Sequence, residues 1–399
     1  MRRGYLPTYL PTYTHTHAML LRIPYTAPFT ALPPLPSSAT TLPAAVTAVA
    51  NFLAHARSTV VLSGAGISVA SGLPDYRGAK GTYTLNKEYR PTFFSEFVHG
   101  DRARRRYWAR SFLGWRGVEG VRPNRGHDAV ARLWRGGWVG GVVTQNVDSL
   151  HTAADADLPV TNLHGLLATI VCLTCRTTYP RAAFQLALRT LNPSWAAFLD
   201  QLREDPSTPV RRNPDGDIDV PGVEYESFRY PPCKTCLENP AYRGRIPVDN
   251  DGAALPSTVR FHSEADTQGH AHVPGVLKPT LVFFGESVLQ AVKDEAEARV
   301  DAADAILVLG SSLATYSAWR LVRRAREQGK KIGVVNLGGV RGEAEFWSDG
   351  GGRVGARYRL GDGRDGVRVE FDVGEVLDGA VEVLLRTDQR EKNILAAHA

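Results

Sequence analysis

The chain has 399 residues, of which 43% are hydrophobic and 22% charged, so it is long enough to bury one large core and to add a smaller unit. No run of about 18 uncharged apolar residues occurs, so the sequence predicts neither a membrane-spanning helix nor a membrane role. The net charge of +6 comes largely from four arginines in residues 1–74, a stretch without a carboxylate, since 43 basic and 41 acidic residues remain beyond it. We therefore expect no broad nucleic-acid-binding face. We interpret the one local cluster, Arg102, Arg104, Arg105 and Arg106, as a solvated helix face rather than a phosphate-binding track.

Residues 1–42 are rich in Thr, Tyr and Pro, contain Arg2, Arg3 and Arg22, and lack any carboxylate. This composition is typical of a transit peptide and predicts a protein of the mitochondrial matrix. A disordered, proline-rich tail without a targeting role is the alternative, because prolines oppose an amphipathic helix.

From Pro43 onward, short apolar runs alternate with helical patterns. A helix from Pro43 leads into the first run, and further helices are expected at 288–302 and 317–328. This alternation predicts an α/β fold with a Rossmann-like, doubly wound parallel sheet in residues 43–171 and 274–385, followed by a tail at 386–399. The runs expected to form strands are Thr59–Leu62, Val139–Val143, Val160–Leu163, Thr280–Phe284, Ala305–Leu309 and Lys331–Val335, with a last strand and helix within Val367–Leu385.

Small and polar residues follow each of these runs. In an open parallel sheet the ligand lies beyond the carboxyl ends of the strands, so these residues are expected to converge on one crevice. Gly and Ser merely ending a strand explain any one of the endings, but not the His, Asn and Gln among them. The endings are Ser63-Gly64, Thr144-Gln145-Asn146, His164-Gly165, Gly285-Glu286, Gly310-Ser311-Ser312 and Asn336-Leu337-Gly338.

In residues 172–273 the alternation stops, which predicts an inserted module. All four cysteines of the chain lie there, in the pairs Cys172-x-x-Cys175 and Cys233-x-x-Cys236. Two such knuckles supply four thiolates for a tetrahedral, structural zinc ion; two disulfides are the competing interpretation. The stretches 205–221 and 237–272 have few apolar residues and are expected to form long loops, as is the glycine-rich segment 350–366.

The segment Ser63-Gly64-Ala65-Gly66-Ile67-Ser68 follows a predicted strand, as a dinucleotide-binding turn does. Taken alone it is weak evidence, because Val69 replaces the third glycine of the usual pattern and a simple tight turn would use the same residues. The adjoining loop Gly72–Gly78 adds Asp75, Tyr76 and Arg77, a set better suited to holding a ligand than to packing.

These motifs, in this order, resemble the sirtuins, which are NAD-dependent protein-lysine deacylases. The resemblance rests on GAGIS at 64–68, GLPDYRG at 72–78, TQNVDSLH at 144–151 and LHG at 163–165 just before a CxxC pair, and it extends from about residue 43 to 385. The segments FFGES at 283–287, GSSLATYSAWRL at 310–321 and VNLGGVR at 335–341 look most like the mitochondrial class II branch.

The resemblance implies a reaction in which the acyl-lysine oxygen attacks the ribose of NAD as nicotinamide leaves, and O-acyl-ADP-ribose forms. It assigns His164 as the general base, with His151 as a structural neighbour, and it places Asn146 and Asp148 at the nicotinamide, with the backbone of Ile67 holding the carboxamide. The cofactor-binding set that it implies is Gly64, Ala65, Gly66, Ile67, Ser68, Asp75, Tyr76, Arg77, Gln145, Asn146, Asp148, His164, Gly310, Ser311, Ser312, Asn336, Leu337, Gly338 and Val373.

For the substrate, the resemblance implies that the peptide lies as an added strand beside Val282-Phe283-Phe284-Gly285-Glu286, although either phenylalanine is equally suited to the core. Tyr107 and Arg110 have the Tyr-x-x-Arg spacing with which some sirtuins bind the carboxylate of an acidic acyl chain, so we expect negatively charged or branched acyl groups. A plain surface helix is the alternative interpretation of that spacing.

Two other functions fit parts of the pattern. A mono-ADP-ribosyltransferase would use the same NAD site and differ in the acceptor. A non-catalytic zinc adaptor would use the knuckles alone, although no interleaving of basic and aromatic residues around them indicates nucleic acid. The expected partners are acylated protein lysines, and the sequence does not indicate an oligomeric state.

Overall fold

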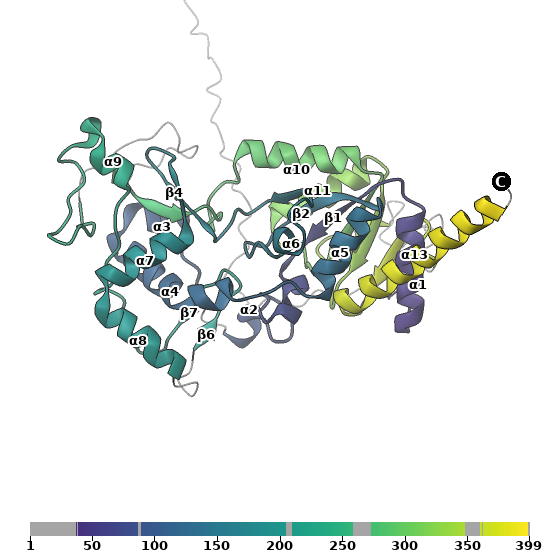
Figure 1. The fold of residues 1–399 in the computed structure, drawn as a ribbon, viewed down its shortest axis with the longest axis horizontal. Helices are drawn as coiled ribbons and strands as arrows, with labels where there is room; N and C mark the ends of the chain where they lie inside the picture. Colours follow the sequence, from purple (N-terminus) through teal and green to yellow (C-terminus); the bar gives the residue numbers. More distant parts are fainter. Residues whose placement is uncertain are drawn as a thin grey trace, which may run out of the picture.

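The computed structural model describes residues 37, 39–86, 89–204, 210–257, 273–347, 360 and 362–397. Most of the predicted leader at 1–42 and of the predicted loop at 350–366 therefore lies outside the described residues. The chain forms two lobes, a large one around a central sheet and a smaller one of helices and short strands (Figure 1). Among the helices of the described residues, none is both long and apolar enough to cross a bilayer.

The large lobe contains a six-stranded parallel sheet, in the order β11-β10-β9-β1-β2-β3. Its central strands are continuous apolar runs that are buried along their whole length, as expected for strands covered on both faces. The predicted Rossmann-like fold is confirmed. The strands are β1 (Thr59–Ser63), β2 (Val139–Thr144), β3 (Val160–Asn162), β9 (Ala305–Leu309), β10 (Lys331–Val335) and β11 (Gly366–Val369).

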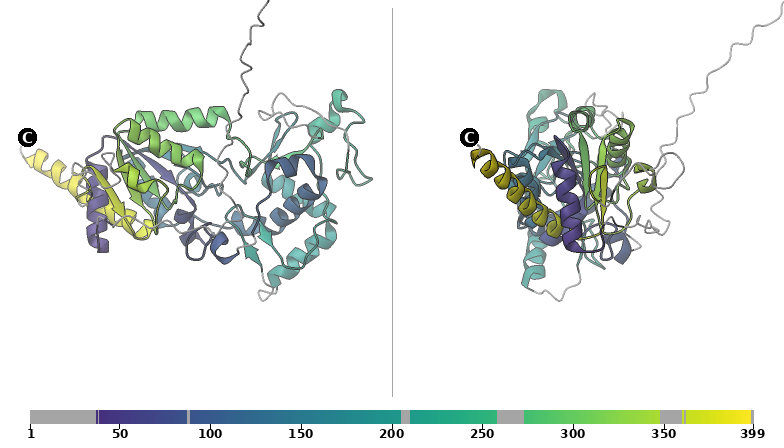
Figure 2. Two further views of the ribbon diagram at one scale, coloured as in Figure 1. Left: turned by 180° about the vertical axis from the view of Figure 1, so that it is seen from behind. Right: turned by 90° about the vertical axis from the view of Figure 1, so that its right-hand side faces the viewer.

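Helices cover both faces of this sheet, as the right-hand view of Figure 2 shows. On one face, Phe52, Leu133 and Leu377 belong to a single buried cluster from α1, α5 and α13; on the other, Leu321 and Ala296 do so from α11 and α10. The last helix continues well past residue 385 and so includes most of the expected tail. The helices are α1 (Leu42–Ala54), α5 (Arg125–Arg135), α10 (Gln290–Ala302), α11 (Tyr316–Glu327) and α13 (Val373–Ala397).

The small lobe draws its core from two separate parts of the chain. Its buried cluster draws side chains from the stretch between Phe94 and Trp115 and from described positions between Leu167 and Phe283, so it is larger than the inserted segment 172–273 alone. The insertion contains two helices that were not predicted from the sequence. Phe184 on one and Trp195 on the other are buried in this cluster. The elements are α3 (Phe94–His99), α4 (Asp101–Glu119), α7 (Arg181–Leu191), α8 (Pro193–Glu204), α9 (Lys234–Glu238), η2 (Pro240–Tyr242), and an antiparallel sheet of β5 (Thr178–Pro180), β4 (Thr169–Cys172) and β8 (Leu277–Pro279).

Three sequence-based expectations were wrong here. The stretch 205–221 contains a hairpin, β6 (Arg211–Arg212) and β7 (Ile218–Asp219), because Ile218 and Val220 pack into the core of the small lobe. Residues 280–284 form no strand of the large sheet; the strand ends at Pro279, and Phe284 makes only an isolated bridge to Phe93. Arg104 does not lie on a solvated face: it is buried, and its guanidinium donates to the Tyr230 hydroxyl and to backbone carbonyls.

Four short elements complete the fold. They lie in the turns that follow strands and in the loops leading to longer helices: η1 (Ala65–Ser71), α2 (Thr82–Leu85), α6 (Leu150–Ala154) and α12 (Glu343–Phe346).

Replacing Gly310 tests the close approach of two loops at the sheet edge. A Cβ on Gly310 would lie 2.5 Å from the amide nitrogen of Ile67, and Gly310 also has a positive φ of 56°. Gly329 is a matched control, because its φ is 69° but nothing lies within 4 Å of its Cβ position. We expect Gly329→Ala to lose about 1 kcal/mol of unfolding free energy from backbone strain, and Gly310→Ala to lose about 2–4 kcal/mol. Urea unfolding measures both, and equal losses would contradict the close approach.

Candidate functional site

The turns that follow β1 and β9 meet where the chain reverses its direction of winding. From β1 the sheet continues through β2 and β3 on one side, and from β9 through β10 and β11 on the other. The amide of Gly66 donates to the carbonyl of Gly310 at 2.8 Å. A Cβ on Gly64 would lie 2.7 Å from the Cβ of Ser311, and one on Gly66 would lie 2.7 Å from the Gly310 oxygen. The glycines are thus required by the contact between two turns, and this contact forms the base of the crevice.

Side chains from three strand ends form a hydrogen-bonded floor beside this contact. The amide of Gln145 donates to Ser311 Oγ at 2.7 Å, and its oxygen accepts from Thr315 at 3.2 Å. The amide of Asn146 donates to the carbonyl of Gly64 and to Ser68 Oγ, each at 3.1 Å. The predicted convergence of strand ends is therefore present in this part of the fold.

Asp148 lies within this network. Its carboxylate accepts from Ser68 Oγ at 2.7 Å and from the amide of Leu150 at 3.0 Å. Burial raises the pKa of Asp148, and these two hydrogen bonds oppose the rise. Asn124, the N-cap of α5, was not predicted as a site residue; its side chain donates to the carbonyl of Ile67 at 2.8 Å and so fixes the turn after β1. Its position just before a helix was the available signal.

His164 lies half-buried between a strand end and α11. Its Nδ1 lies 3.1 Å from the carbonyl oxygen of Gln145, and its Nε2 lies 2.7 Å from Ser317 Oγ. Because a carbonyl can only accept, Nδ1 carries the proton and Nε2 accepts from the serine. Burial lowers the pKa of His164 to about 4, so the ring is neutral at physiological pH. Ser317 was not predicted as a site residue. It contacts His164 because α11 packs beside the strand end that carries the histidine.

His151, the other histidine of the same motif, lies away from this arrangement. It is buried, its Nε2 is 2.8 Å from Ser63 Oγ, and its ring centroid is 5.0 Å from that of His127. Burial and then the nearby His127 lower the pKa of His151 to about 3. These contacts are those of a packed, uncharged ring beneath the sheet edge.

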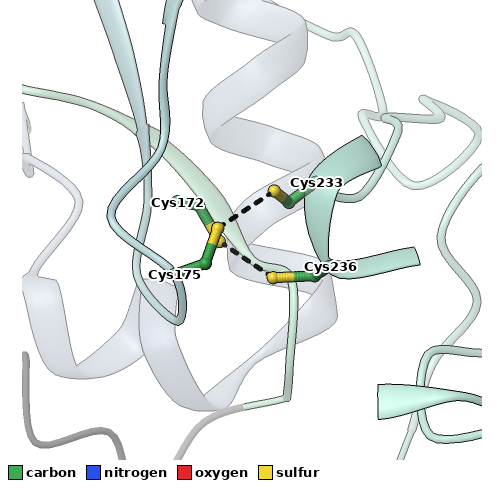
Figure 3. A group of neighbouring side chains, drawn as sticks. All are labelled: Cys172, Cys175, Cys233 and Cys236. Atoms are coloured by element: carbon green, nitrogen blue, oxygen red, sulfur yellow. Dashed lines mark hydrogen bonds between the residues drawn. The ribbon is translucent and has the colours of Figure 1, made fainter. Parts of the chain in front are cut away.

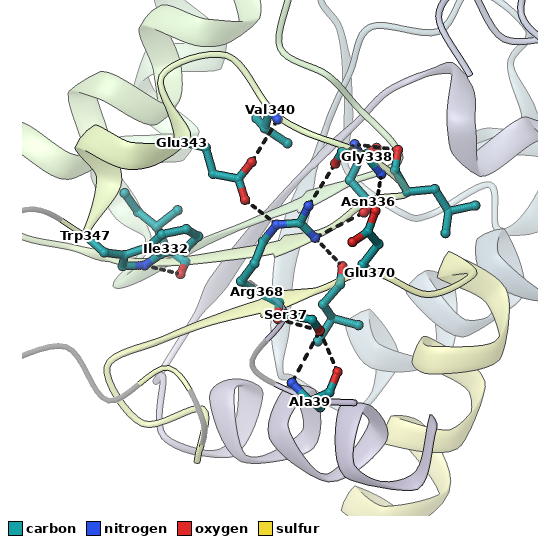
Figure 4. Close-up of polar contacts among 12 residues, drawn as sticks. Ser37, Ala39, Ile332, Asn336, Gly338, Val340, Glu343, Trp347, Arg368 and Glu370 are labelled. Carbon is teal, nitrogen blue, oxygen red and sulfur yellow. Dashed lines mark hydrogen bonds and ion pairs between the residues drawn. The ribbon is translucent and has the colours of Figure 1, made fainter. Parts of the chain in front are cut away.

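The turn after β10 is held by a fully buried arginine, Arg368 (Figure 4). The guanidinium of Arg368 forms an ion pair with Glu343 and donates to the carbonyls of Asn336 and Gly338 at 3.1 and 2.8 Å. Leu337, between them, is 67% exposed. The backbone of this turn is therefore held in place by Arg368, while the side chain of Leu337 is exposed at the sheet edge. Val373, by contrast, is buried in the core at the beginning of α13.

The loop 72–78 leaves the turn after β1 and reaches the small lobe. Asp75 is turned inward, where its carboxylate accepts from the amide of Gly78 at 2.9 Å. Tyr76 stacks on Tyr83 with ring centroids 5.7 Å apart, and Arg77 lies over the same ring at 5.2 Å. The polar groups of this loop are therefore already arranged by contacts within the loop and with Tyr83 of α2. Of the remaining predicted cofactor residues, Ala65 lies in η1, and the carbonyl of Ser312 accepts from the amide of Arg341.

The predicted substrate segment passes directly beside His164. The amide of Val282 donates to the carbonyl of His164 at 2.8 Å. Phe283 is buried in the small lobe, whereas Phe284 is half-buried, so one of the two phenylalanines is a core residue. Glu286 accepts from the amide of Phe283 at 2.8 Å and pairs with the buried Lys278 at 3.2 Å. These contacts fix the segment between the lobes.

Tyr107 and Arg110 both lie buried on α4, so they are not on a plain surface helix. The ring of Tyr107 packs edge-on against Phe283, with centroids 4.9 Å apart. The guanidinium of Arg110 pairs with Asp217 at 3.0 Å, and Asp217 belongs to the β6–β7 hairpin. The structure thus brings Tyr107 to the predicted substrate segment, and it gives Arg110 a carboxylate partner from this chain.

The four cysteines converge in the small lobe (Figure 3). Their sulfur atoms all lie within 4.8 Å of one another, with Cys172–Cys236 at 3.6 Å and Cys175–Cys233 at 3.5 Å. A tetrahedral zinc site with bonds of about 2.3 Å has sulfur–sulfur edges of about 3.8 Å, close to these distances. All four cysteines are free thiols. The donor set and its spacing fit one structural zinc ion, as predicted.

Comparisons with known proteins match this geometry. The model of the Sir2 family matches residues 64–317. The chain is 37% identical over 294 residues to the NAD-dependent protein deacylase SIR4 of Batrachochytrium dendrobatidis, across 72% of this chain and 84% of that protein. It is 37% identical over 296 residues to an NAD-dependent protein deacetylase of Bordetella bronchiseptica, across 74% and 89%. A structure described as "Structural Basis for the Mechanism and Regulation of Sir2 Enzymes" superposes with a TM-score of 0.51 at 25% identity, covering 86% of this chain and 98% of that one.

Removing one thiolate tests the zinc site. We expect the purified chain to carry one zinc ion, and Cys236→Ser to lose it, because a hydroxyl is a poor ligand for zinc in place of a thiolate. Since all four cysteines contact the core of the small lobe, the variant should also unfold at a lower temperature. Thr235→Ser, on the same knuckle, is the control and should keep both metal and stability. Native mass spectrometry and circular dichroism measure the two properties. Metal-free wild-type protein with undiminished stability would contradict the assignment.

Proposed function

The chain belongs to the Sir2 family, the sirtuins, and from this premise we propose that it is an NAD-dependent protein-lysine deacylase in which His164 is the general base. Such an enzyme transfers the acyl group of a modified lysine to the ADP-ribose part of NAD and releases nicotinamide. The observation that carries the proposal is the position of His164: a neutral, hydrogen-bonded imidazole lies between the strand-end crevice and the predicted substrate segment.

The crevice at the sheet edge has the chemistry needed to hold NAD. When bound, NAD supplies an electrophilic ribose carbon with nicotinamide as its leaving group. Gln145 and Ser311 would meet the polar portions of the dinucleotide, and the turn Asn336–Gly338 its adenosine end. The buried Asn146 and the half-buried Asp148, both hydrogen-bonded to the hydroxyl of Ser68, form the polar pocket proposed for the carboxamide of nicotinamide. A pocket held by hydrogen bonds in advance orients its ligand at little cost in conformational entropy.

His164 is arranged to accept a proton. The carbonyl of Gln145 fixes the proton on Nδ1, which leaves the lone pair of Nε2 toward the site, where it now accepts from Ser317. Because burial lowers the pKa of His164 to about 4, this lone pair is available throughout the physiological pH range. A ribose hydroxyl is the proton donor that the proposed reaction provides.

The substrate peptide is proposed to add as a strand at Phe284–Gly285. The buried Phe283 and the Glu286–Lys278 pair hold this segment, and the amide of Val282 joins it to His164. An extended peptide gains main-chain hydrogen bonds by such addition without regard to most of its side chains. The acyl-lysine is then proposed to enter beside the rings of Tyr107 and Phe283.

Paired histidine variants test the proposal. We expect His164→Gln to lower kcat by about 100-fold or more, the usual contribution of a general base. His151→Gln should instead lower the melting temperature and keep most of the turnover per folded molecule, since His151 contacts the core. Nicotinamide release and peptide mass are measured together with NAD and an acetyl-lysine peptide.

The alternative outcomes are distinct in this assay. Nicotinamide release with an ADP-ribose mass added to protein would favour a mono-ADP-ribosyltransferase. An active His164→Gln enzyme beside an inactive but folded His151→Gln enzyme would reverse the assignment of the base.

We further propose that the chain falls in the mitochondrial class II branch of the family. The segments at 283–287, 310–321 and 335–341 support this placement. A family tree that groups the chain with another branch would contradict it.

We also propose that the protein resides in the mitochondrial matrix. Residues 1–42 support this through their arginines and lack of carboxylates. We expect a fluorescent protein carrying residues 1–42 to enter isolated mitochondria and become protected from added protease. The same fusion with Arg2→Glu, Arg3→Glu and Arg22→Glu should stay outside, since transit peptides depend on positive charge. A wild-type fusion that remains accessible to protease would overturn the proposal.

A further inference from the structure

We propose that the β6–β7 hairpin sets the acyl preference of the enzyme: Asp217 occupies Arg110, so neutral acyl chains are removed in preference to chains that end in a carboxylate. This inference rests on the proposed deacylase function and names the class of substrate for that site. It replaces the expectation of acidic acyl groups, which was drawn from the Tyr-x-x-Arg spacing alone.

Arg110 lies where the end of an acyl chain would arrive. One turn before it on α4, Tyr107 packs its ring 4.9 Å from that of Phe283 in the proposed substrate segment. On the other side, Pro74 of the loop after η1 lines the same groove as Asp217. Arg110 therefore lies one helical turn from the residue that contacts the proposed substrate segment and is paired with the hairpin, and its side chain is only 2% exposed.

The positive charge of Arg110 is already matched. Its Nη2 lies 3.0 and 3.2 Å from the two carboxylate oxygens of Asp217. Asn213, on the same hairpin, donates to Asp217 at 2.5 Å through its side chain and at 3.0 Å through its backbone. An acyl chain that ends in a carboxylate would have to displace this anion and leave it buried without a cation, which is strongly unfavourable. A neutral chain leaves the pair intact.

A second carboxyl group indicates that the cluster does not tolerate additional negative charge. Asp215 accepts from the Tyr89 hydroxyl at 3.4 Å. Burial, and next the charge of Asp217, raise the pKa of Asp215 to about 8, although Arg110 opposes the rise. The charged form of this second carboxyl group is thus disfavoured in the folded chain. The carboxylate of an incoming acyl chain would likewise lose its hydration and be repelled by the charge of Asp217.

The β6–β7 hairpin packs closely against α4, the helix that carries Arg110. A Cβ on Gly114 of α4 would lie 2.2 Å from the carbonyl oxygen of Gly216, and one on Gly117 would lie 2.4 Å from the Arg212 guanidinium. The two glycines lie three residues apart and so share a face of the helix. Gly114 lets the backbone of the hairpin rest directly on α4 beside Asp217, and Gly117 leaves room for the side chain of Arg212.

Butyryl-lysine and succinyl-lysine peptides of one sequence test the proposal, because the two acyl chains have the same length and differ in the terminal carboxylate. We expect the wild-type chain with NAD to favour butyryl in kcat/KM by about tenfold or more, and Asp217→Asn to move the ratio toward succinyl by a similar factor. The ratio is measured on one preparation, so a smaller folded fraction does not affect it. Asp219→Asn, which removes the same charge from the same hairpin 3.9 Å from Arg110 Nε, is the matched control and should change the ratio less than about threefold.

Combining Asp217→Asn with Arg110→Gln should abolish the gain for succinyl, since no cation then remains to bind it. A wild-type preference for succinyl, or an unchanged ratio in Asp217→Asn, would overturn the proposal. Failure of the wild type to release nicotinamide with either peptide would overturn the deacylase function itself, and this inference with it. The two failures are therefore distinguishable.

Discussion

The close backbone contact between the turns after β1 and β9 is the constraint on which the site depends. Gly64 and Gly66 touch Gly310 and Ser311 so closely that no Cβ fits at either position. The contact lies where the sheet reverses its winding, and there two turns diverge from neighbouring parallel strands and leave a crevice. In this chain the backbones of the two turns touch at the base of the crevice, where the amide of Gly66 donates to the carbonyl of Gly310. Gln145 and Asn146 directly follow the adjacent strand β2. The side chain of Gln145 donates to Ser311 in the turn after β9, and that of Asn146 donates to the carbonyl of Gly64 in the turn after β1.

Much of this arrangement was predictable, and for a local reason. Parallel strands buried on both faces are continuous apolar runs, so β1, β2, β9 and β10 stand out in the sequence, and the polar residues after them must gather at one edge. The four cysteines were predictable because their spacing carries the geometry of the metal. In each case a short stretch of chain determines its own structure.

The parts that were not predictable depend on contacts between distant residues. Arg110 and Asp217 are separated by 107 positions, and nothing near either residue indicates the other. The helices α7 and α8 were missed because the surrounding stretch is rich in Pro, Asp and Gly, although Phe184 and Trp195 supply apolar faces that pack in the small lobe. Residues 280–284 have the composition of a strand, yet only Thr280 hydrogen-bonds to a strand, β4 of the small lobe, while Val282 and Phe284 bond to His164 and Phe94. Tertiary context overrides local preference at these sites.

The zinc knuckles are connected through a short stretch of chain to His164, the proposed general base. The amide of Cys233 donates to the carbonyl of Gly275 at 2.8 Å. Shortly after Gly275 the chain forms β8, which pairs with β4, the strand that ends at Cys172. Beyond β8 the chain turns, and the amide of Val282 reaches the carbonyl of His164. The metal site therefore holds one end of a short segment whose other end lies beside the proposed base. Because only a few residues separate the two ends, loosening the knuckles would free the segment proposed to bind the substrate. A structural ion can in this way be required for catalysis without touching a reacting atom.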